Sequence, residues 1–147
     1  MSFEGGPFVQ FACFCEMVLE DKTSAFSLIR IIDTITQSAT GPEPPQGMPS
    51  FGAPLNLAIG LKSGKAIGRH ELIITPERPN GSTLEQKSMS IHFEGEEKGC
   101  NVFLKMNIIF DMEGLYIFHI QLGEERITAI PLRVKYQRMM LGFPQSN

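Results

Sequence analysis

The chain has 147 residues, a formal net charge of −3, 42% hydrophobic residues and 20% charged residues. A chain of this size predicts one domain over residues 1–147, with its core at about 8–136 and a tail at 137–147. Nucleic-acid binders usually carry a basic excess and membrane spans need about 20 apolar residues in a row, so neither nucleic acid nor a membrane is an expected partner.

The N-terminal region lacks the features of a secretory signal. Its first charge is Glu4 and no basic residue precedes Lys22, whereas a signal peptide begins with a basic segment. The three cysteines cannot all pair in disulfides, which favours a reducing compartment. A cytoplasmic protein is therefore expected.

Apolar side chains return at every second position along most of the chain, a period that predicts β-strands rather than helices. Residues 8–17 form the first expected strand. Residues 26–36, rich in β-branched side chains and apolar on both faces, form an expected central strand. Strands at 54–62 and 69–75 follow. The core-facing positions predicted in the first and third strands are Val9, Phe11, Cys13, Cys15, Met17, Leu55, Leu57, Ile59 and Leu61.

The second half of the chain continues the pattern after a turn signal at Asn80-Gly81. Strands are expected within 83–93, 99–111, 115–122 and 126–136. Because Pro131 cannot donate a ladder hydrogen bond, the last strand is predicted to lie at an edge or to carry a bulge. The predicted core-facing positions are Met89, Ile91, Phe93, Cys100, Val102, Leu104, Met106, Ile108, Phe110, Tyr116, Phe118, Ile120, Leu122, Thr128, Ile130, Leu132, Val134 and Tyr136.

About eight strands joined by short turns predict an all-β fold, an antiparallel immunoglobulin-like β-sandwich. The exception to the short turns is the segment 38–53, "SATGPEPPQGMPSFGA", which is rich in proline and glycine. This composition argues against a helix or a central strand. A connection of this length in a compact domain is usually functional or mobile.

The stretch "DMEGLYIFHI" (111–120) carries the spacing Asp111, Gly114, Tyr116 at the start of a strand. In immunoglobulin-like sandwiches, a tyrosine near the start of the penultimate strand hydrogen-bonds upstream backbone. Gly114 would supply the backbone freedom for the turn. The spacing fits this tyrosine corner, and a short hairpin with a packed tyrosine remains the alternative.

Four quoted segments, "VQFACFCEMV", "FSLIRIIDTI", "GRHELIITPERPNG" and "IIFDMEGLYIFHIQLGEERITAIPLRV", together resemble an uncharacterised bacterial family. Its members are small β-sandwich proteins with a domain of unknown function, and the resemblance covers about residues 8–136. The resemblance implies a sandwich in a bacterial cytoplasm. It implies no catalytic residues.

Cys13 and Cys15 lie two apart on one strand, so both thiols share a face and could bind zinc with Cys100 and a histidine. Their register with Phe11 and Met17 favours the alternative, small core side chains.

The remaining polar candidates also have structural interpretations. His70, His92 and His119 lie on three different predicted strands without metal-site spacing, and "GLKSGK" (60–65) is better explained by a hairpin turn than by a phosphate loop. Asp33 is either a buried acid or, more simply, a residue at a turn or solvated edge. Three cations near the last strand predict a solvated edge or a docking site for an acidic partner: Arg126, Arg133 and Lys135.

Several apolar side chains fall on strand faces opposite the assigned core: Phe8, Phe14, Ile29, Ile31, Ile35, Phe103 and Ile109. An exposed apolar patch marks a protein contact. A non-enzymatic interaction or assembly module without a cofactor is therefore expected, binding another protein or itself as a homo-oligomer. The predicted interface includes Phe8, Phe14, Ile29 and Ile31, unless Met48 and Phe51 of the 38–53 loop cover them. The alternative function is a small-ligand or carbohydrate-binding sandwich with its site at that loop.

Overall fold

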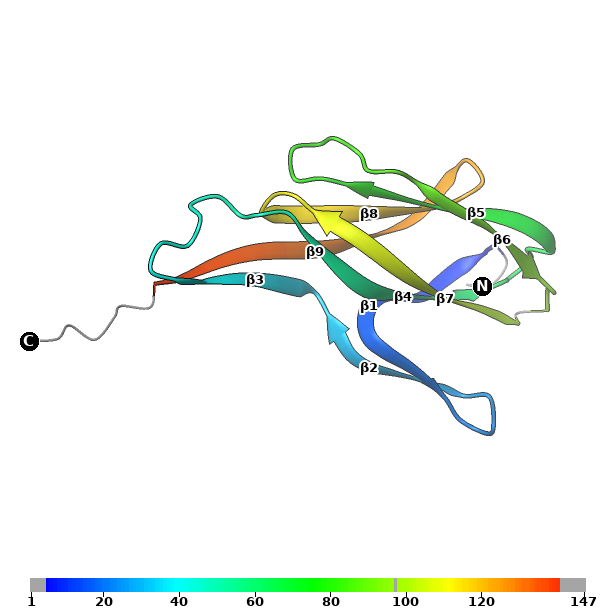
Figure 1. The fold of residues 1–147 in the computed structure, drawn as a ribbon. Helices are drawn as coiled ribbons and strands as arrows, with labels where there is room; N and C mark the ends of the chain where they lie inside the picture. The colour runs from blue at the N-terminus through cyan, green and yellow to red at the C-terminus, as the bar shows by residue number, and fades with distance from the viewer. Residues whose placement is uncertain (1–4, 97, 141–147) are drawn as a thin grey trace, which may run out of the picture.

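The computed structural model describes residues 5–96 and 98–140 (Figure 1). Its nine strands are β1 (Phe8–Glu20), β2 (Phe26–Ile32), β3 (Thr34–Gly41), β4 (Phe51–Lys62), β5 (Gly68–Glu77), β6 (Lys87–Phe93), β7 (Gly99–Phe110), β8 (Gly114–Leu122) and β9 (Glu125–Met140). Within the described residues no helix is long and apolar enough to cross a membrane.

The strands form two sheets, one in the order β2-β1-β4-β7 and the other in the order β3-β9-β8-β5-β6. Neighbouring strands are antiparallel except β3 and β9, which run parallel. Strands β1, β4 and β7 in one sheet, with β5, β8 and β9 in the other, give the immunoglobulin-like arrangement. The predicted all-β sandwich is confirmed, with nine strands instead of about eight.

The core lies between the sheets and follows the predicted alternation closely from β4 to β9. In β4, for example, Leu57, Ile59 and Leu61 are fully buried. Each such side chain stabilises the fold by about 1.5–3 kcal/mol. Phe14 of β1 contacts Phe118 of β8 at a ring-centroid distance of 4.7 Å, which joins the two sheets.

The single central strand predicted at 26–36 is wrong. The chain leaves the first sheet after Ile32 and enters the second at Thr34, so β2 and β3 are edge strands of different sheets. Asp33 at the crossing is exposed, and its carbonyl accepts a hydrogen bond from the Arg133 N–H at 3.0 Å. The segment is apolar on both faces because Ile32 and Ile35 pack on the core at opposite sides of this crossing.

The core face predicted for β1 is right at Val9 and wrong from Phe11 onward. The β1–β4 register shifts between Val9 and Phe11, which changes the face that each following residue presents. As a result, Phe14 is fully buried, whereas Met17 is 50% exposed. The ring of Phe11 lies against Gly60 of β4, where a side chain would overlap it.

The long loop is shorter than the predicted 38–53, because residues 38–41 belong to β3 and β4 begins at Phe51. Two hydrogen bonds fix the remaining 42–50 loop to β9. The Tyr136 hydroxyl donates to the Pro45 carbonyl at 2.6 Å, and Arg138 donates to the Pro44 carbonyl at 2.9 Å. The predicted tail at 137–147 is corrected as well, since β9 continues to Met140 and only 141–147 lie outside the described residues.

The edge position predicted for the last strand is wrong, because β9 lies between β3 and β8. β9 pairs with β3 only from Arg133 onward. Pro131, which has no N–H, therefore lies before this pairing begins, where β3 needs no hydrogen bond from β9. The other predicted possibility, a bulge, is present: the β8–β9 register passes from the pair Ile120–Thr128 to the pair Gln121–Arg126, so Ile127 of β9 has no partner. This bulge lies four residues before Pro131 and not at the proline itself. Arg133 and Lys135 are exposed on an inner strand, not on a solvated edge.

Candidate functional site

The β1–β2 hairpin projects from the first sheet and curves beneath it (Figure 1). The ring of Phe26 in β2 lies 4.6 Å from that of Phe103 in β7, although these strands are the opposite edges of their sheet. Phe103 lies on the face of β7 that points away from the core, because the residue before it, Val102, is buried and neighbouring residues of a strand point to opposite faces. The hairpin therefore folds over the outer face of the sheet.

The bend of this hairpin coincides with an unusual backbone conformation in β2. Arg30 has φ of 54°, a value that residues other than glycine adopt rarely. It lies between the cross-strand pairs Cys15–Ile31 and Met17–Ile29, and its guanidinium forms an ion pair with Glu16 at 3.1 Å. Both side chains of the ion pair are more than half exposed, so the pair itself contributes little.

The tip of the hairpin is held by Asp21. Its carboxylate accepts hydrogen bonds from the Thr23 hydroxyl at 2.6 Å, the Thr23 N–H at 2.7 Å and the Ala25 N–H at 3.2 Å. These bonds, that from the Thr23 side chain above all, lower the pKa of Asp21. Such a local network gives the two strands a defined turn without help from the sandwich.

Half of the large exposed apolar side chains in the described residues lie on this hairpin. We define the hairpin patch as Met17, Leu19, Ile29 and Ile31, which are 50%, 48%, 39% and 65% exposed. Met17 and Ile29 are direct cross-strand partners, and the other two follow along the same strands. The fifth side chain, Phe26, is turned toward Phe103.

The predicted interface residues are not brought together. Ile29 and Ile31 are exposed as expected, whereas Phe14 belongs to the core and Phe8 is partly buried in β1. Met48 and Phe51 pack against the core and do not cover the hairpin; the structure places Phe51 5.5 Å from Phe110, measured between ring centroids.

Sequence reasoning missed Met17 and Leu19, two members of the hairpin patch. One signal could have found them. The apolar alternation of β1 continues past Met17 to Leu19, so the strand pattern of 13 residues already included both side chains.

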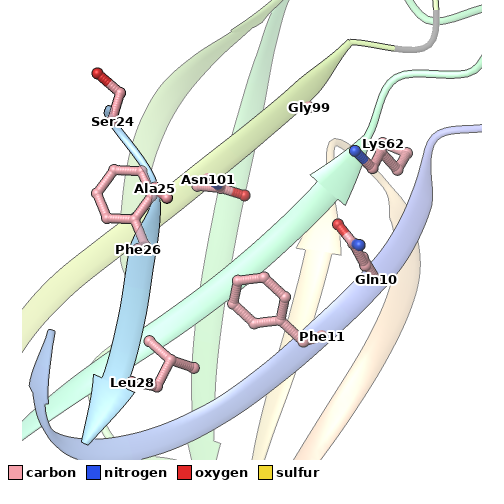
Figure 2. Close-up of a pocket in the computed structure, with 9 residues that line it drawn as sticks. All are labelled: Gln10, Phe11, Ser24, Ala25, Phe26, Leu28, Lys62, Gly99 and Asn101. Atoms are coloured by element: carbon pink, nitrogen blue, oxygen red, sulfur yellow. The ribbon is translucent and has the colours of Figure 1, made fainter. Parts of the chain in front are cut away.

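A hollow of about 440 Å³ lies between the hairpin and the outer face of the sheet (Figure 2). Figure 2 shows the polar ends of Gln10, Lys62 and Asn101 directed toward a common space, with the ring of Phe11 below them. The described residues that line it are Gln10, Phe11, Ser24, Ala25, Phe26, Leu28, Lys62, Gly99 and Asn101. The hollow therefore combines one cation, two amides and an apolar side.

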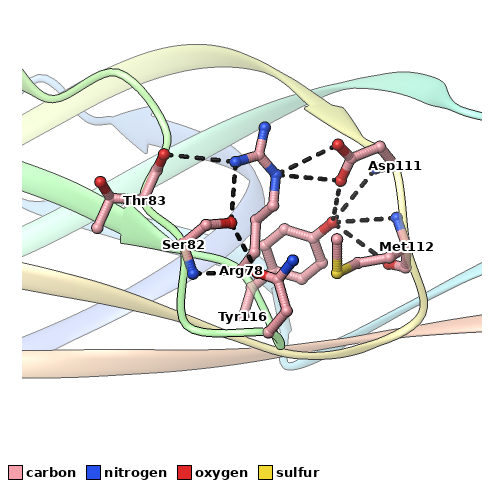
Figure 3. Close-up of polar contacts among 7 residues, drawn as sticks. Arg78, Ser82, Thr83, Asp111, Met112 and Tyr116 are labelled. Atoms are coloured by element: carbon pink, nitrogen blue, oxygen red, sulfur yellow. Dashed lines mark hydrogen bonds and ion pairs between the residues drawn. The ribbon is translucent and has the colours of Figure 1, made fainter.

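The tyrosine corner predicted at 111–116 is confirmed (Figure 3). The Tyr116 oxygen accepts hydrogen bonds from the N–H groups of Asp111 at 3.2 Å and Met112 at 3.3 Å. Its own proton is within reach of the Asp111 carboxylate at 3.2 Å. Burial, the largest influence, raises the pKa of Tyr116. The corner thus holds the chain where it passes from β7 in one sheet to β8 in the other.

Two neighbours complete this corner. Gly114 has φ of 129°, and a Cβ there would lie 2.7 Å from the Pro79 side chain, so only glycine fits. Arg78 forms an ion pair with Asp111 at 3.2 Å and also donates to the Ser82 hydroxyl at 3.2 Å (Figure 3). The loop after β5 is thereby fastened to the β7–β8 turn. These contacts serve the fold.

The three cysteines are free, with Cys15 buried and Cys13 and Cys100 partly buried. Burial is the main reason why the pKa of each thiol is raised, and the neighbouring Cys15 adds to the effect at Cys13. In the described part of the chain, no group of three or more His, Cys, Asp or Glu side chains could hold a metal ion. Cys100 packs against the core, whereas Cys13 and Cys15, predicted to be small core side chains, do not belong to the core cluster.

The thiol environment predicts slow alkylation. At neutral pH a raised pKa leaves less thiolate, the reactive form, and the fold shields Cys15 completely. Iodoacetamide should modify Cys15 in the native protein at least about tenfold more slowly than in the chain unfolded by guanidinium. Peptide mass spectrometry over time measures both rates, and equal rates would contradict the prediction.

The histidines remain apart from one another. His119 lies 3.0 Å from the Glu77 carboxylate of the neighbouring strand, a contact that sequence spacing did not reveal. His70 lies 5.2 Å from the Phe93 ring, and His92 is exposed. The "GLKSGK" segment forms the end of β4 and a turn in which the Ala66 N–H donates to the Ser63 carbonyl. The predicted hairpin is wrong, because the strands on either side of this turn, β4 and β5, belong to different sheets.

Comparisons with known proteins bear on the family and on the fold of this chain. A model described as "Family of unknown function (DUF6941)" matches residues 10–135. No curated protein matches the sequence. An immunoglobulin-like protein from Pseudomonas aeruginosa is similar at 12% identity and a TM-score of 0.43, over 90% of this chain and 98% of that one. The alkylpurine DNA glycosylase AlkC of Pseudomonas fluorescens, bound to DNA containing an abasic site analogue, is similar at 13% identity and a TM-score of 0.44. That match covers 67% of this chain but only 27% of the glycosylase.

Proposed function

The chain belongs to DUF6941, a family of unknown function, and from that premise we propose that it is a non-enzymatic protein-interaction module that self-associates through the hairpin patch. The observation that supports this function is the concentration of exposed apolar side chains on one projecting hairpin. Such patches mark protein contacts in proteins that are otherwise polar at the surface. The three free cysteines support a reducing, cytoplasmic setting for the module.

A second copy of the chain is the proposed occupant of the hairpin patch. A twofold contact sets the same four side chains of each protomer against those of the other, and full burial of each contributes about 1.5–3 kcal/mol. Glu16 and Arg30 beside the patch carry opposite charges. Across the twofold axis, Glu16 of one protomer can therefore face Arg30 of the other. Edge-to-edge pairing of β2 is disfavoured because the positive φ at Arg30 interrupts the row of backbone donors and acceptors.

Analytical ultracentrifugation at micromolar concentration tests the proposal. The protein should sediment as a dimer, and the double variant Ile29→Thr/Ile31→Thr should sediment as a 16.4 kDa monomer. Threonine keeps the β-branched shape that strands favour while removing apolar surface. The matched control is Ile67→Thr, because Ile67 is 72% exposed outside the hairpin and its replacement should leave the dimer unchanged. A wild-type monomer, or a dimer insensitive to the double replacement, would disprove self-association through the patch.

A small-ligand-binding sandwich is the second candidate function. The 42–50 loop, expected to form such a site, is instead fastened to β9 through the carbonyls of Pro44 and Pro45. The observation that favours ligand binding is the hollow beneath the hairpin, whose volume falls in the range of small-molecule sites.

A further inference from the structure

We propose that the hollow beneath the β1–β2 hairpin binds a carboxylate attached to an aromatic ring, either a small aromatic acid or the C-terminal aromatic residue of a peptide. This site lies on the concave side of the hairpin. It shares no residue with the hairpin patch and does not depend on self-association.

The polar end of the hollow is suited to one carboxylate. Among the nine described residues that line the hollow, Lys62 is the only charged one, so none of these nine supplies a carboxylate to neutralise the ammonium group. The side chains of Gln10 and Asn101, which come from β1 and β7, point toward the same space as Lys62 (Figure 2). Amide NH₂ groups and an ammonium group are all donors to carboxylate oxygen.

A singly charged acid fits this end better than a phosphate does. Phosphate dianions are usually held by several arginines or by rows of backbone N–H groups at a helix N-terminus. Here one lysine faces two neutral amides. The charge of the site therefore matches a single negative charge.

The apolar end is suited to a flat ring. The Phe11 ring is fixed against β4 because Gly60 leaves it room. Phe26 forms the opposite wall and is itself held by Phe103 at 4.6 Å. Leu28 closes the space between the two phenylalanines on the hairpin side. Aromatic rings pack favourably with one another at centroid distances of about 4.5–7 Å.

The volume of about 440 Å³ accommodates such a ligand, since small-molecule sites commonly measure about 300–1,000 Å³. The walls come from four strands, β1, β2, β4 and β7. A bound ligand would thus touch both the hairpin and the sheet.

Titration followed by NMR tests the site, with N-acetyl-phenylalanine as the probe. The amide resonances of Phe11 and Asn101 should shift, and the affinity should be at least about tenfold higher than for N-acetyl-phenylalaninamide, which lacks the charge. Glucuronate, a carboxylate without a flat apolar ring, should also bind at least about tenfold more weakly. The peptide Gly-Gly-Gly-Phe and 3-phenylpropionate distinguish the two sources of the carboxylate: binding of the peptide indicates a C-terminus, and binding of 3-phenylpropionate alone indicates a free acid.

Replacement of Lys62 by methionine keeps much of the apolar stem and removes the charge. We expect Lys62→Met to weaken binding of N-acetyl-phenylalanine about tenfold and to abolish the preference over the neutral amide. Lys65→Met is the control, because Lys65 is exposed in the following turn and does not line the hollow. Equal binding of acid and amide, tighter binding of glucuronate, or no resonance shift at millimolar probe would overturn the proposal. The same titration on the Ile29→Thr/Ile31→Thr variant separates a failure of this site from a failure of self-association.

Discussion

Replacing Phe14 with alanine is expected to lower the free energy of unfolding by about 3–5 kcal/mol. Phe14 is fully buried, and its ring packs edge-on against Phe118 of the opposite sheet at 4.7 Å. Truncation removes this contact between the sheets and leaves a cavity that close-packed neighbours fill only in part. Denaturant unfolding followed by fluorescence or circular dichroism measures the loss, and an equal slope m for the wild type and the variant shows that only stability has changed.

Ile109→Thr is the control for this measurement. Ile109 is 59% exposed on the outer face of β7 and lies outside the hairpin patch. Its replacement should change the free energy of unfolding by no more than about 0.5 kcal/mol. Similar losses in the two variants would show that Phe14 is not part of the core, which is what the alternation of β1 alone suggests.

Replacing Tyr116 with phenylalanine is expected to cost about 1–3 kcal/mol of unfolding free energy. The ring remains packed against Phe110 at 4.9 Å, so the change removes only the hydroxyl. Two backbone N–H groups, those of Asp111 and Met112, then lose the acceptor that satisfies them at the crossing between the sheets. These two donors are partly buried, and a partly buried donor left without a partner still carries a desolvation penalty. Urea unfolding of the purified variant gives the value.

Tyr136→Phe is the matched control, because the Tyr136 hydroxyl also makes one hydrogen bond to backbone, at 2.6 Å from the Pro45 carbonyl. That bond lies in an exposed region where water can replace the lost donor. The cost should stay below about 1 kcal/mol. If Tyr116→Phe were no more destabilising than Tyr136→Phe, the corner would not be what holds the crossing together.

The two surfaces of the hairpin make different demands on the same element. The hairpin patch needs the strands to project from the sandwich, whereas the hollow needs them to curve back toward Phe103. The positive φ at Arg30 sets the bend of the hairpin, and the hydrogen bonds to Asp21 set the turn at its tip. Both features lie within the hairpin itself, so they allow it to project from the sandwich and also to curve back. Each surface can therefore be removed by substitution without disturbing the other.

The sequence by itself determined the features that depend on local stereochemistry. Successive side chains of a pleated strand point to opposite faces, so the period of two located core positions such as Leu57, Met106 and Ile120 directly. The spacing of Asp111, Gly114 and Tyr116 likewise predicted the corner, because all three residues lie close together in the sequence, across the β7–β8 turn and the start of β8.

Only the tertiary structure decided which face of β1 is buried and where the segment 26–36 divides. Both depend on pairing between strands that are distant in the chain. The register shift of β1 arises in its pairing with β4. The chain crosses at Asp33 because the residues that follow pair with β9. The hollow has the same origin, since Gln10, Lys62 and Asn101 stand on strands far apart in the chain. No local period encodes their meeting. It follows from sheet order and from the bend of the hairpin, which bring the three side chains to one space.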